Sequence, residues 1–151
     1  MLFKTHLAFG FLVWLLIRPY FSINKYLLLA VVLLASVLPD IDKSNSKVGS
    51  KIKPISFLIE KIFGHRKLFH SLFLWGIISV FVWYFLDKGY AGAILIGTTS
   101  HLIADGLTKQ GVNFLYPVSQ FRIAGFIETG SLFEIIFLML VLGLIVIAFL
   151  F

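Results

Sequence analysis

Histidine and aspartate side chains recur along this chain in an order that suggests a metal site. Among its four histidines and seven acidic residues, the candidate ligands are His6, Asp40, Asp42, His65, His70, His101 and Asp105. Imidazole and carboxylate groups bind borderline divalent ions such as Zn²⁺, Mn²⁺ and Fe²⁺. Because the chain contains no cysteine, any such ion must be held by nitrogen and oxygen ligands.

His101 and Asp105 are the most informative pair, because they lie four residues apart in an apolar stretch. Residues at this spacing share one face of a helix. An unpaired charge in such a stretch is costly, so ionisable groups there are usually paired or functional. The pair predicts either shared metal binding or a direct hydrogen bond without metal.

The segment Leu38-Pro39-Asp40-Ile41-Asp42 follows an apolar stretch. A proline ends a helix, and alternate residues of an extended segment point the same way, so both carboxylates could face one ion. Alternatively, the two aspartates only cap the end of the helix. His6 also has two interpretations, as a ligand or as an ordinary histidine at a membrane interface.

His65 and His70 are five residues apart, which is about 140° out of phase on a helix. We therefore expect His65 to reach the site from a loop and His70 from the first turn of the next helix. Seven donors exceed one tetrahedral site and suit two ions roughly 3.5 to 4 Å apart. Glu134 is left out of this set, because it follows Ser131 at the spacing of a capping box, which favours helix capping over ligation.

The composition indicates a membrane protein. Of the 151 residues, 60% are hydrophobic and only 13% are charged, and the mean hydropathy is +1.01. An ordinary soluble domain carries about a quarter charged residues. A chain so poor in charge needs lipid around it.

Five apolar stretches predict an all-α polytopic membrane protein with about five transmembrane helices, forming a single membrane domain over residues 1–151. The stretches cover 2–17, 26–38, 69–86, 90–107 and 131–151. A full crossing needs roughly 20 residues, so the first two are short. No small-residue cleavage site follows the first stretch, which we therefore interpret as an uncleaved helix and not a signal peptide.

The polar segment 41–68 separates the second and third stretches and carries seven basic residues. Within it, apolar residues at helical spacing behind Pro54 predict a short amphipathic helix over 54–63, lying on the membrane surface. The basic residues indicate membrane topology and affinity for anionic lipid. Nucleic acid is not an expected partner, because no basic face with interleaved aromatic residues occurs outside the apolar stretches.

Charge distribution predicts the orientation of the chain in the membrane. With five crossings, the N-terminus and the segments 41–68 and 108–130 share one side. That side holds ten of the thirteen basic residues, against Arg18, Lys25 and Lys88 on the other. The positive-inside rule then makes the N-terminus cytoplasmic and places Phe151 outside. All seven candidate ligands converge on the cytoplasmic face.

The ordered motifs resemble those of the YdjM-like family of inner-membrane metal-dependent hydrolases. They are His6, Leu38-Pro39-Asp40-Ile41-Asp42, His65-Arg66 with His70-Ser71, Ser100-His101 with Asp105, and Gly111-Val112 before Leu115-Tyr116-Pro117. That family is distantly similar to zinc-dependent phospholipases C and single-strand nucleases. The resemblance implies metal ligation by His6, Asp40, His65, His70, His101 and Asp105, with Asp42 as an outer or bridging group. The phospholipases also use a processed N-terminus, but no processing site precedes His6, so a third zinc lacks support.

These features predict a metal-dependent hydrolase that cleaves a phosphoester, such as a phospholipid head group, at the cytoplasmic membrane face. Asp42 or Asp105 could accept the proton of the attacking water. Arg66 and Arg122 could anchor the phosphate, although both could equally be interfacial anchors. The alternatives are a divalent-metal transporter or sensor, and a membrane scaffold with a structural metal. Transporters usually hold ions near the bilayer midplane, which ranks transport second.

Overall fold

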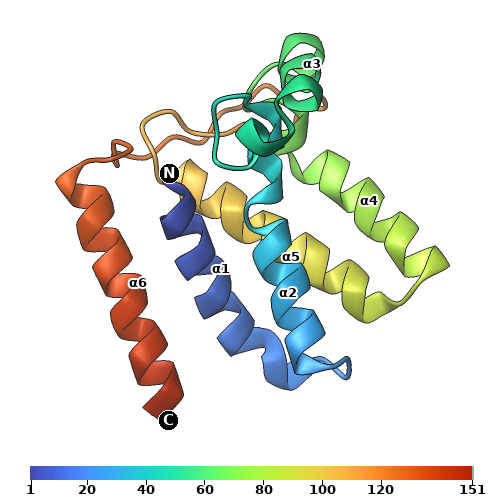
Figure 1. Ribbon diagram of the computed structural model, residues 1–151, viewed down its shortest axis with the longest axis vertical. Helices are drawn as coiled ribbons and strands as arrows, with labels where there is room; N and C mark the ends of the chain where they lie inside the picture. The colour runs from blue at the N-terminus through green and yellow to red at the C-terminus, as the bar shows by residue number, and fades with distance from the viewer. Residues whose placement is uncertain (151) are drawn as a thin grey trace.

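The computed structural model describes residues 1–150 as an all-α protein with six α-helices (Figure 1), which confirms the predicted fold class. They are α1 (Phe3–Ile17), α2 (Lys25–Ala35), α3 (Lys53–Phe63), α4 (Leu72–Phe85), α5 (Lys88–Gly106) and α6 (Leu132–Leu150). Four short 3-10 helices join them: η1 (Arg18–Tyr20), η2 (Leu38–Asp42), η3 (Gly49–Ile52) and η4 (Leu68–His70). Residue 151 lies outside the described part of the chain.

The long helices place the polar segments at one end of the molecule. Figure 1 shows α1, α2 and α6 running roughly lengthwise, with α4 and α5 inclined to them and α5 crossing behind α1 and α2, while α3 lies above them. The N-terminus and the segments 36–71 and 107–131 lie at this upper end, which we call the polar end. The end of α6 and the short connections 18–24 and 86–87 lie toward the opposite, distal end. This arrangement agrees with the expected grouping of 41–68 and 108–130 with the N-terminus.

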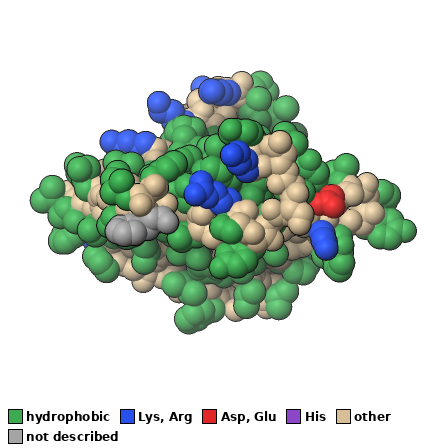
Figure 2. Space-filling model, turned by 90° about the horizontal axis from the view of Figure 1, so that it is seen from below, with side chains coloured by type: hydrophobic (Ala, Val, Ile, Leu, Met, Phe, Trp, Pro, Cys, Tyr) green, Lys and Arg blue, Asp and Glu red, His purple; other side chains and the backbone are tan. Residues whose placement is uncertain are grey.

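The distal end has the surface expected of a protein in lipid. Viewed from below in Figure 2, it is mainly hydrophobic with scattered charged side chains, and no histidine is visible on that face. By length and composition, α6 is the one described helix that could cross a membrane, and α4 is a shorter apolar helix. A count of five crossings therefore stays a prediction.

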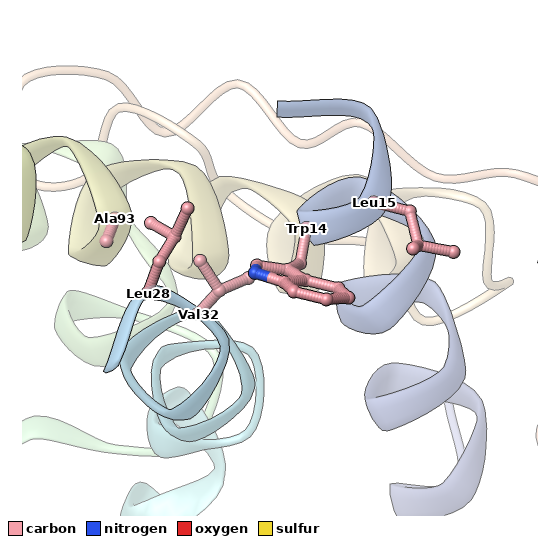
Figure 3. Close-up of a cluster of buried hydrophobic side chains, with 5 residues drawn as sticks. All are labelled: Trp14, Leu15, Leu28, Val32 and Ala93. Carbon is pink, nitrogen blue, oxygen red and sulfur yellow. The ribbon is translucent and has the colours of Figure 1, made fainter. Parts of the chain in front are cut away.

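Helices α1, α2 and α5 pack around a small apolar core at the distal end. Its buried members are Trp14, Leu15, Leu28, Val32 and Ala93 (Figure 3). Nearer the polar end, α2 and α5 approach so closely that a Cβ on Gly97 would lie 2.7 Å from both the Ala35 Cβ and the Val32 carbonyl oxygen. Gly97 is one turn before His101, so this contact fixes the position from which α5 presents its site residues.

Two local predictions are wrong. Residues 38–42 form the 3-10 helix η2 and not an extended segment. Pro39 lies in its first turn, where the fixed φ of proline suits a helical backbone. Asp40 and Asp42 approach different nitrogens of His70, Asp40 the Nε2 at 3.7 Å and Asp42 the Nδ1 at 2.9 Å, and they belong to different possible metal groups. His70 ends η4 instead of lying on the first turn of α4, because the Ser71 side chain caps α4 by accepting a hydrogen bond from the Leu74 N–H.

Candidate metal centre

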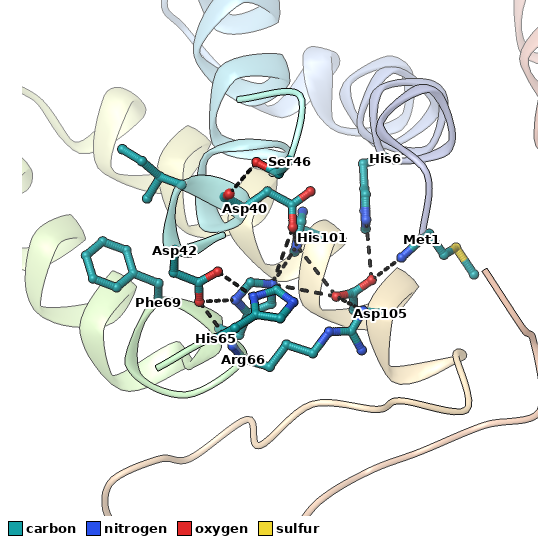
Figure 4. Close-up of polar contacts among 12 residues, drawn as sticks. Met1, His6, Asp40, Asp42, Ser46, His65, Arg66, Phe69, His101 and Asp105 are labelled. Atoms are coloured by element: carbon teal, nitrogen blue, oxygen red, sulfur yellow. Dashed lines mark hydrogen bonds and ion pairs between the residues drawn. The ribbon is translucent and has the colours of Figure 1, made fainter. Parts of the chain in front are cut away.

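All seven predicted ligand side chains meet at the polar end (Figure 4). They come from α1, η2, η4, α5 and the turn before η4. Their ligand atoms form three groups that could each hold a metal ion, namely His6–Asp40–His101, Asp42–His65–His70 and His70–His101–Asp105. The helices thus bring together residues up to about a hundred positions apart in the sequence.

Four donor atoms at the centre of this cluster have nearly the spacing of a metal shell. The Nε2 atoms of His70 and His101 are 3.2 Å apart. Asp105 Oδ2 is 3.6 Å from the His70 Nε2 and 3.9 Å from the His101 Nε2, and Asp40 Oδ1 is 3.7 and 3.9 Å from the same two atoms. In a tetrahedral zinc site with bonds of about 2.0–2.1 Å, neighbouring ligand atoms are roughly 3.4 Å apart. Small movements would therefore let His70, His101 and Asp105 bind one ion, with Asp40 close to both imidazoles.

The His101 ring is oriented for metal binding by the backbone of the α2 terminus. Its Nδ1 lies 2.8 Å from the Ser36 carbonyl oxygen. A carbonyl can only accept a hydrogen bond, so Nδ1 carries the proton and the lone pair is on Nε2. That tautomer presents Nε2 to His70, Asp40 and Asp105.

Asp42 holds two imidazoles at once. This fully buried carboxylate lies 2.7 Å from His65 Nδ1 through one oxygen and 2.9 Å from His70 Nδ1 through the other. The Arg66 backbone N–H also donates to Oδ2, at 3.1 Å. Carboxylates that accept from one imidazole nitrogen commonly leave the other free for a metal. An ion bound directly by Asp42, His65 and His70 would instead replace these hydrogen bonds.

The charges of the cluster favour ionised carboxylates beside a protonated His70. Burial would raise the pKa of Asp40 and Asp42, but the adjacent histidines outweigh it and lower the pKa of both. Burial would likewise lower the pKa of His70, whereas Asp40 and Asp42 raise it to about 9. A divalent cation could replace the proton on His70 and neutralise the same carboxylates.

His6 provides a further indication that the cluster fits a metal. Its ring stacks on His101 with centroids 3.9 Å apart. Both ring nitrogens are buried without a hydrogen-bond partner, although Nε2 is 3.3 Å from Asp105 Oδ1 in an unsuitable geometry. Buried polar atoms without partners are costly and rare. Coordination of His6 to an ion would remove this cost, so the donor set fits a divalent metal.

Arg66 connects the turn before η4 to the end of α5. Its backbone has φ of 60°, a left-handed conformation that is uncommon for residues other than glycine. This turn lets both the His65 ring and the Arg66 N–H reach Asp42. The Arg66 guanidinium lies 2.9 Å from Asp105 Oδ2 and donates to the carbonyl of Gly111, at 2.8 Å. Much of the predicted phosphate anchor is therefore engaged inside the protein, and its role toward a substrate stays a prediction.

Sequence reasoning missed the contacts that join α6 to the start of α1. Glu134 accepts hydrogen bonds from the Leu2 N–H at 2.6 Å, from the Thr5 hydroxyl at 2.8 Å and from the Gly130 N–H at 2.7 Å. The Ser131 hydroxyl, buried, has no partner, so the predicted reciprocal capping box does not form. Glu134 belongs to none of the three possible metal groups. The Met1 ammonium forms an ion pair with Asp105 that the sequence did not indicate.

The fold and the site define a helical protein whose buried His/Asp cluster could hold metal ions. Comparison with protein families matches residues 1–151 to the YdjM inner membrane protein family, and the chain belongs to this family. Membership of the YdjM family and the inner-membrane location are thereby confirmed, whereas the hydrolase activity, the number of crossings and the orientation stay predictions.

Individual relatives agree with this assignment. The uncharacterized protein YvsG of Bacillus subtilis (strain 168) is 33% identical over 134 residues, which cover 87% of this chain and 83% of YvsG. The inner membrane protein YdjM of Escherichia coli (strain K12) is 37% identical over 92 residues, covering 56% of this chain and 46% of that relative. YdjM of Shigella flexneri gives the same values. No solved structure matches the chain.

Proposed function

We propose that this protein is a metal-dependent hydrolase that cleaves a phosphoester at the cytoplasmic face of the inner membrane. The observation that carries the proposal is the pair of oriented imidazoles. The Nε2 atoms of His70 and His101 face each other at 3.2 Å, while Asp42 and the Ser36 carbonyl hold their Nδ1 atoms. Rings locked in this way are pre-organised to bind a metal.

Access to the cluster supports catalysis over a purely structural metal. A cavity of about 280 Å³ at the polar end is lined by Asp40, His65 and Arg66, among others. The side chains of Asp40 and His65 are 17% and 24% exposed, whereas His70 and His101 are fully buried. A structural site is closed, but a catalytic site keeps a position open to water or substrate.

The residues divide the work of the proposed reaction. A bound divalent ion would supply Lewis-acid chemistry and lower the pKa of its water. Asp42 is better suited to orient His65 and His70 than to accept a proton, because both its oxygens are engaged. Asp105 is the candidate proton acceptor where it does not itself bind the ion. Its Oδ1 pairs with the Met1 ammonium, but its Oδ2 contacts the Arg66 guanidinium as an ion pair, at 2.9 Å, and has no hydrogen bond among the described residues.

The number of ions depends on which of the three possible metal groups can bind an ion at the same time. His6–Asp40–His101 and Asp42–His65–His70 share no residue, so two ions could be held at once. A single ion in the third group would use His70, His101 and Asp105 and leave Asp42 as an orienting group. We propose zinc, with Mn²⁺ or Fe²⁺ as the other ions that this donor set suits.

The geometry gives metal transport no comparable support. Within the described chain, α4 contains no carboxylate or imidazole, and α5 contains none between Lys88 and His101. An ion leaving the cluster toward the distal end would therefore find no ligand of these kinds on either helix.

The test is metal content and hydrolysis measured on the same detergent-purified protein. After loading with Zn²⁺ or Mn²⁺, we expect cleavage within a panel of phospholipids, isoprenoid phosphates and nucleotides. His101→Ala and Asp105→Ala should each lower both metal per chain and hydrolysis. Glu128→Gln is the matched control, because this acid pairs only with Lys109 at the surface. Full metal occupancy in His101→Ala, or metal uptake into liposomes without any hydrolysis, would contradict the proposal.

A further inference from the structure

A second cavity lies beside the metal centre and is lined by basic side chains. It measures about 410 Å³, and Lys43, Arg66, Lys67, Arg122, Gln110 and Asn113 contribute to its wall. No carboxylate is among the described residues that line it. Lys43, Lys67 and Arg122 form no ion pair with any described residue, in contrast to Lys109, which pairs with Glu128. A concave surface with several cations and no acid attracts anions.

This cationic cavity adjoins the cavity that contains Asp40. Lys43, His65, Arg66 and Gln110 line both of them. His65 lies between the two cavities, and its Nδ1 is hydrogen-bonded to Asp42 Oδ1 at 2.7 Å. A molecule that places one group beside Asp40 would therefore carry its neighbouring group toward Lys67 and Arg122.

The backbone holds the cationic wall in place. Val112 and Ile123 exchange two hydrogen bonds, at 2.9 and 3.0 Å, and so fix the residue that follows Arg122. The Arg66 guanidinium is anchored on the Gly111 carbonyl.

We infer that the cavity lined by Lys43, Lys67 and Arg122 is an anion subsite that binds a second anionic group of the substrate. For the identity of the substrate, this inference rests on the proposed function. The chemistry required is a phosphoester with two anionic groups, such as a phospholipid with two phosphate groups or a diphosphate. Apolar side chains adjoin the basic ones, since Phe121 and Ile123 flank Arg122 and are 74% and 46% exposed. Basic groups between apolar ones suit a lipid head group at the membrane surface.

The experiment compares two proteins. The double variant carries both Lys67→Gln and Arg122→Gln, and the control carries both Lys61→Gln and Lys88→Gln. The control also removes two surface charges, but neither residue lines the cavity. Binding to purified protein is measured with inorganic pyrophosphate, and separately with vesicles of cardiolipin, which carries two phosphates, or of phosphatidylcholine. We expect the double variant to bind pyrophosphate or cardiolipin at least tenfold more weakly, equivalent to about 1.4 kcal/mol. Metal per chain should be unchanged in both proteins.

The two probes separate the sources of the anion. Loss confined to cardiolipin vesicles identifies a lipid head group, whereas loss of pyrophosphate binding shows that a soluble diphosphate also fits. If the double variant and the wild type bind the probes equally, the subsite is overturned. It is also overturned if the control loses as much affinity as the double variant, because the loss would then reflect surface charge alone. If no hydrolysis is found but the selective loss of binding is seen, the subsite stands and the proposed catalysis fails. If a dianionic substrate is cleaved, its KM should rise in the double variant with kcat within about twofold.

Discussion

Replacing Asp42 by asparagine tests whether this residue orients the metal ligands or binds the metal itself. The substitution preserves size at a fully buried position. Aspartate accepts from His65 Nδ1 at 2.7 Å and from His70 Nδ1 at 2.9 Å. Asparagine offers one acceptor oxygen and one donor amide group. One of the two rings must then turn or adopt the tautomer with its proton on Nε2, which cannot bind a metal.

The size of the effect depends on which role Asp42 has. Losing an outer partner of a metal-binding histidine typically weakens metal binding by about 10- to 100-fold, or about 1.4 to 2.8 kcal/mol. We therefore expect Asp42→Asn to keep the wild-type number of ions per chain at saturating zinc while its affinity falls within that range. If Asp42 ligates a second ion, the variant should lose that ion completely and keep the other.

The assay is competition for zinc against a fluorescent chelator, together with elemental analysis of the saturated protein. Glu128→Gln, which removes the same charge from an exposed site, should bind zinc like the wild type. Wild-type zinc affinity in Asp42→Asn would refute the reasoning, because neither orientation nor ligation by this carboxylate could then matter.

Three further predictions address the framework around the site. Gly97→Ala should lower the melting temperature by several degrees, because its Cβ would lie 2.7 Å from the Ala35 Cβ and overpacking costs about 1–3 kcal/mol. Gly76→Ala is the control and should leave the melting temperature unchanged, because no atom lies within 4 Å of its Cβ. Equal melting temperatures of the two variants would contradict the packing argument. Arg66→Lys should also lower the melting temperature, because one ammonium group cannot contact both the Asp105 carboxylate and the Gly111 carbonyl. An unchanged melting temperature would show that these two contacts of Arg66 do not contribute to stability. Labelling from outside should modify a cysteine appended after residue 151 and miss Ser46→Cys, and the reverse pattern would reverse the proposed orientation.

The candidate ligands could be found from the sequence because few other residues in this chain are ionisable and lie beside apolar segments. His101 and Asp105 stood out for that reason, and the spacing behind Pro54 gave α3 nearly its observed bounds. The contacts that orient the ligands could not be found in this way. The carbonyl of Ser36 is available to His101 only because α2 ends there, and Asp42 reaches two rings only because Arg66 adopts a left-handed turn.

Long-range links had no sequence signal either. Glu134 showed a familiar local spacing from Ser131, yet its bond to Leu2 spans 132 positions and depends on how α6 packs beside α1. The 3-10 helix η2 was likewise hidden, because a proline is compatible both with ending a helix and with starting a tight one.

The shortness of α2 has a consequence for how a lipid could meet the cluster. Eleven residues at about 1.5 Å each make a helix of roughly 16 Å, near half of a hydrocarbon core about 30 Å thick. If α2 crosses the membrane as predicted, a bilayer that matches its length is thinner around the protein than far from it. Local thinning of this kind would bring head groups to the level of the cluster, so that a lipid could present its phosphate while its acyl chains stay in the membrane.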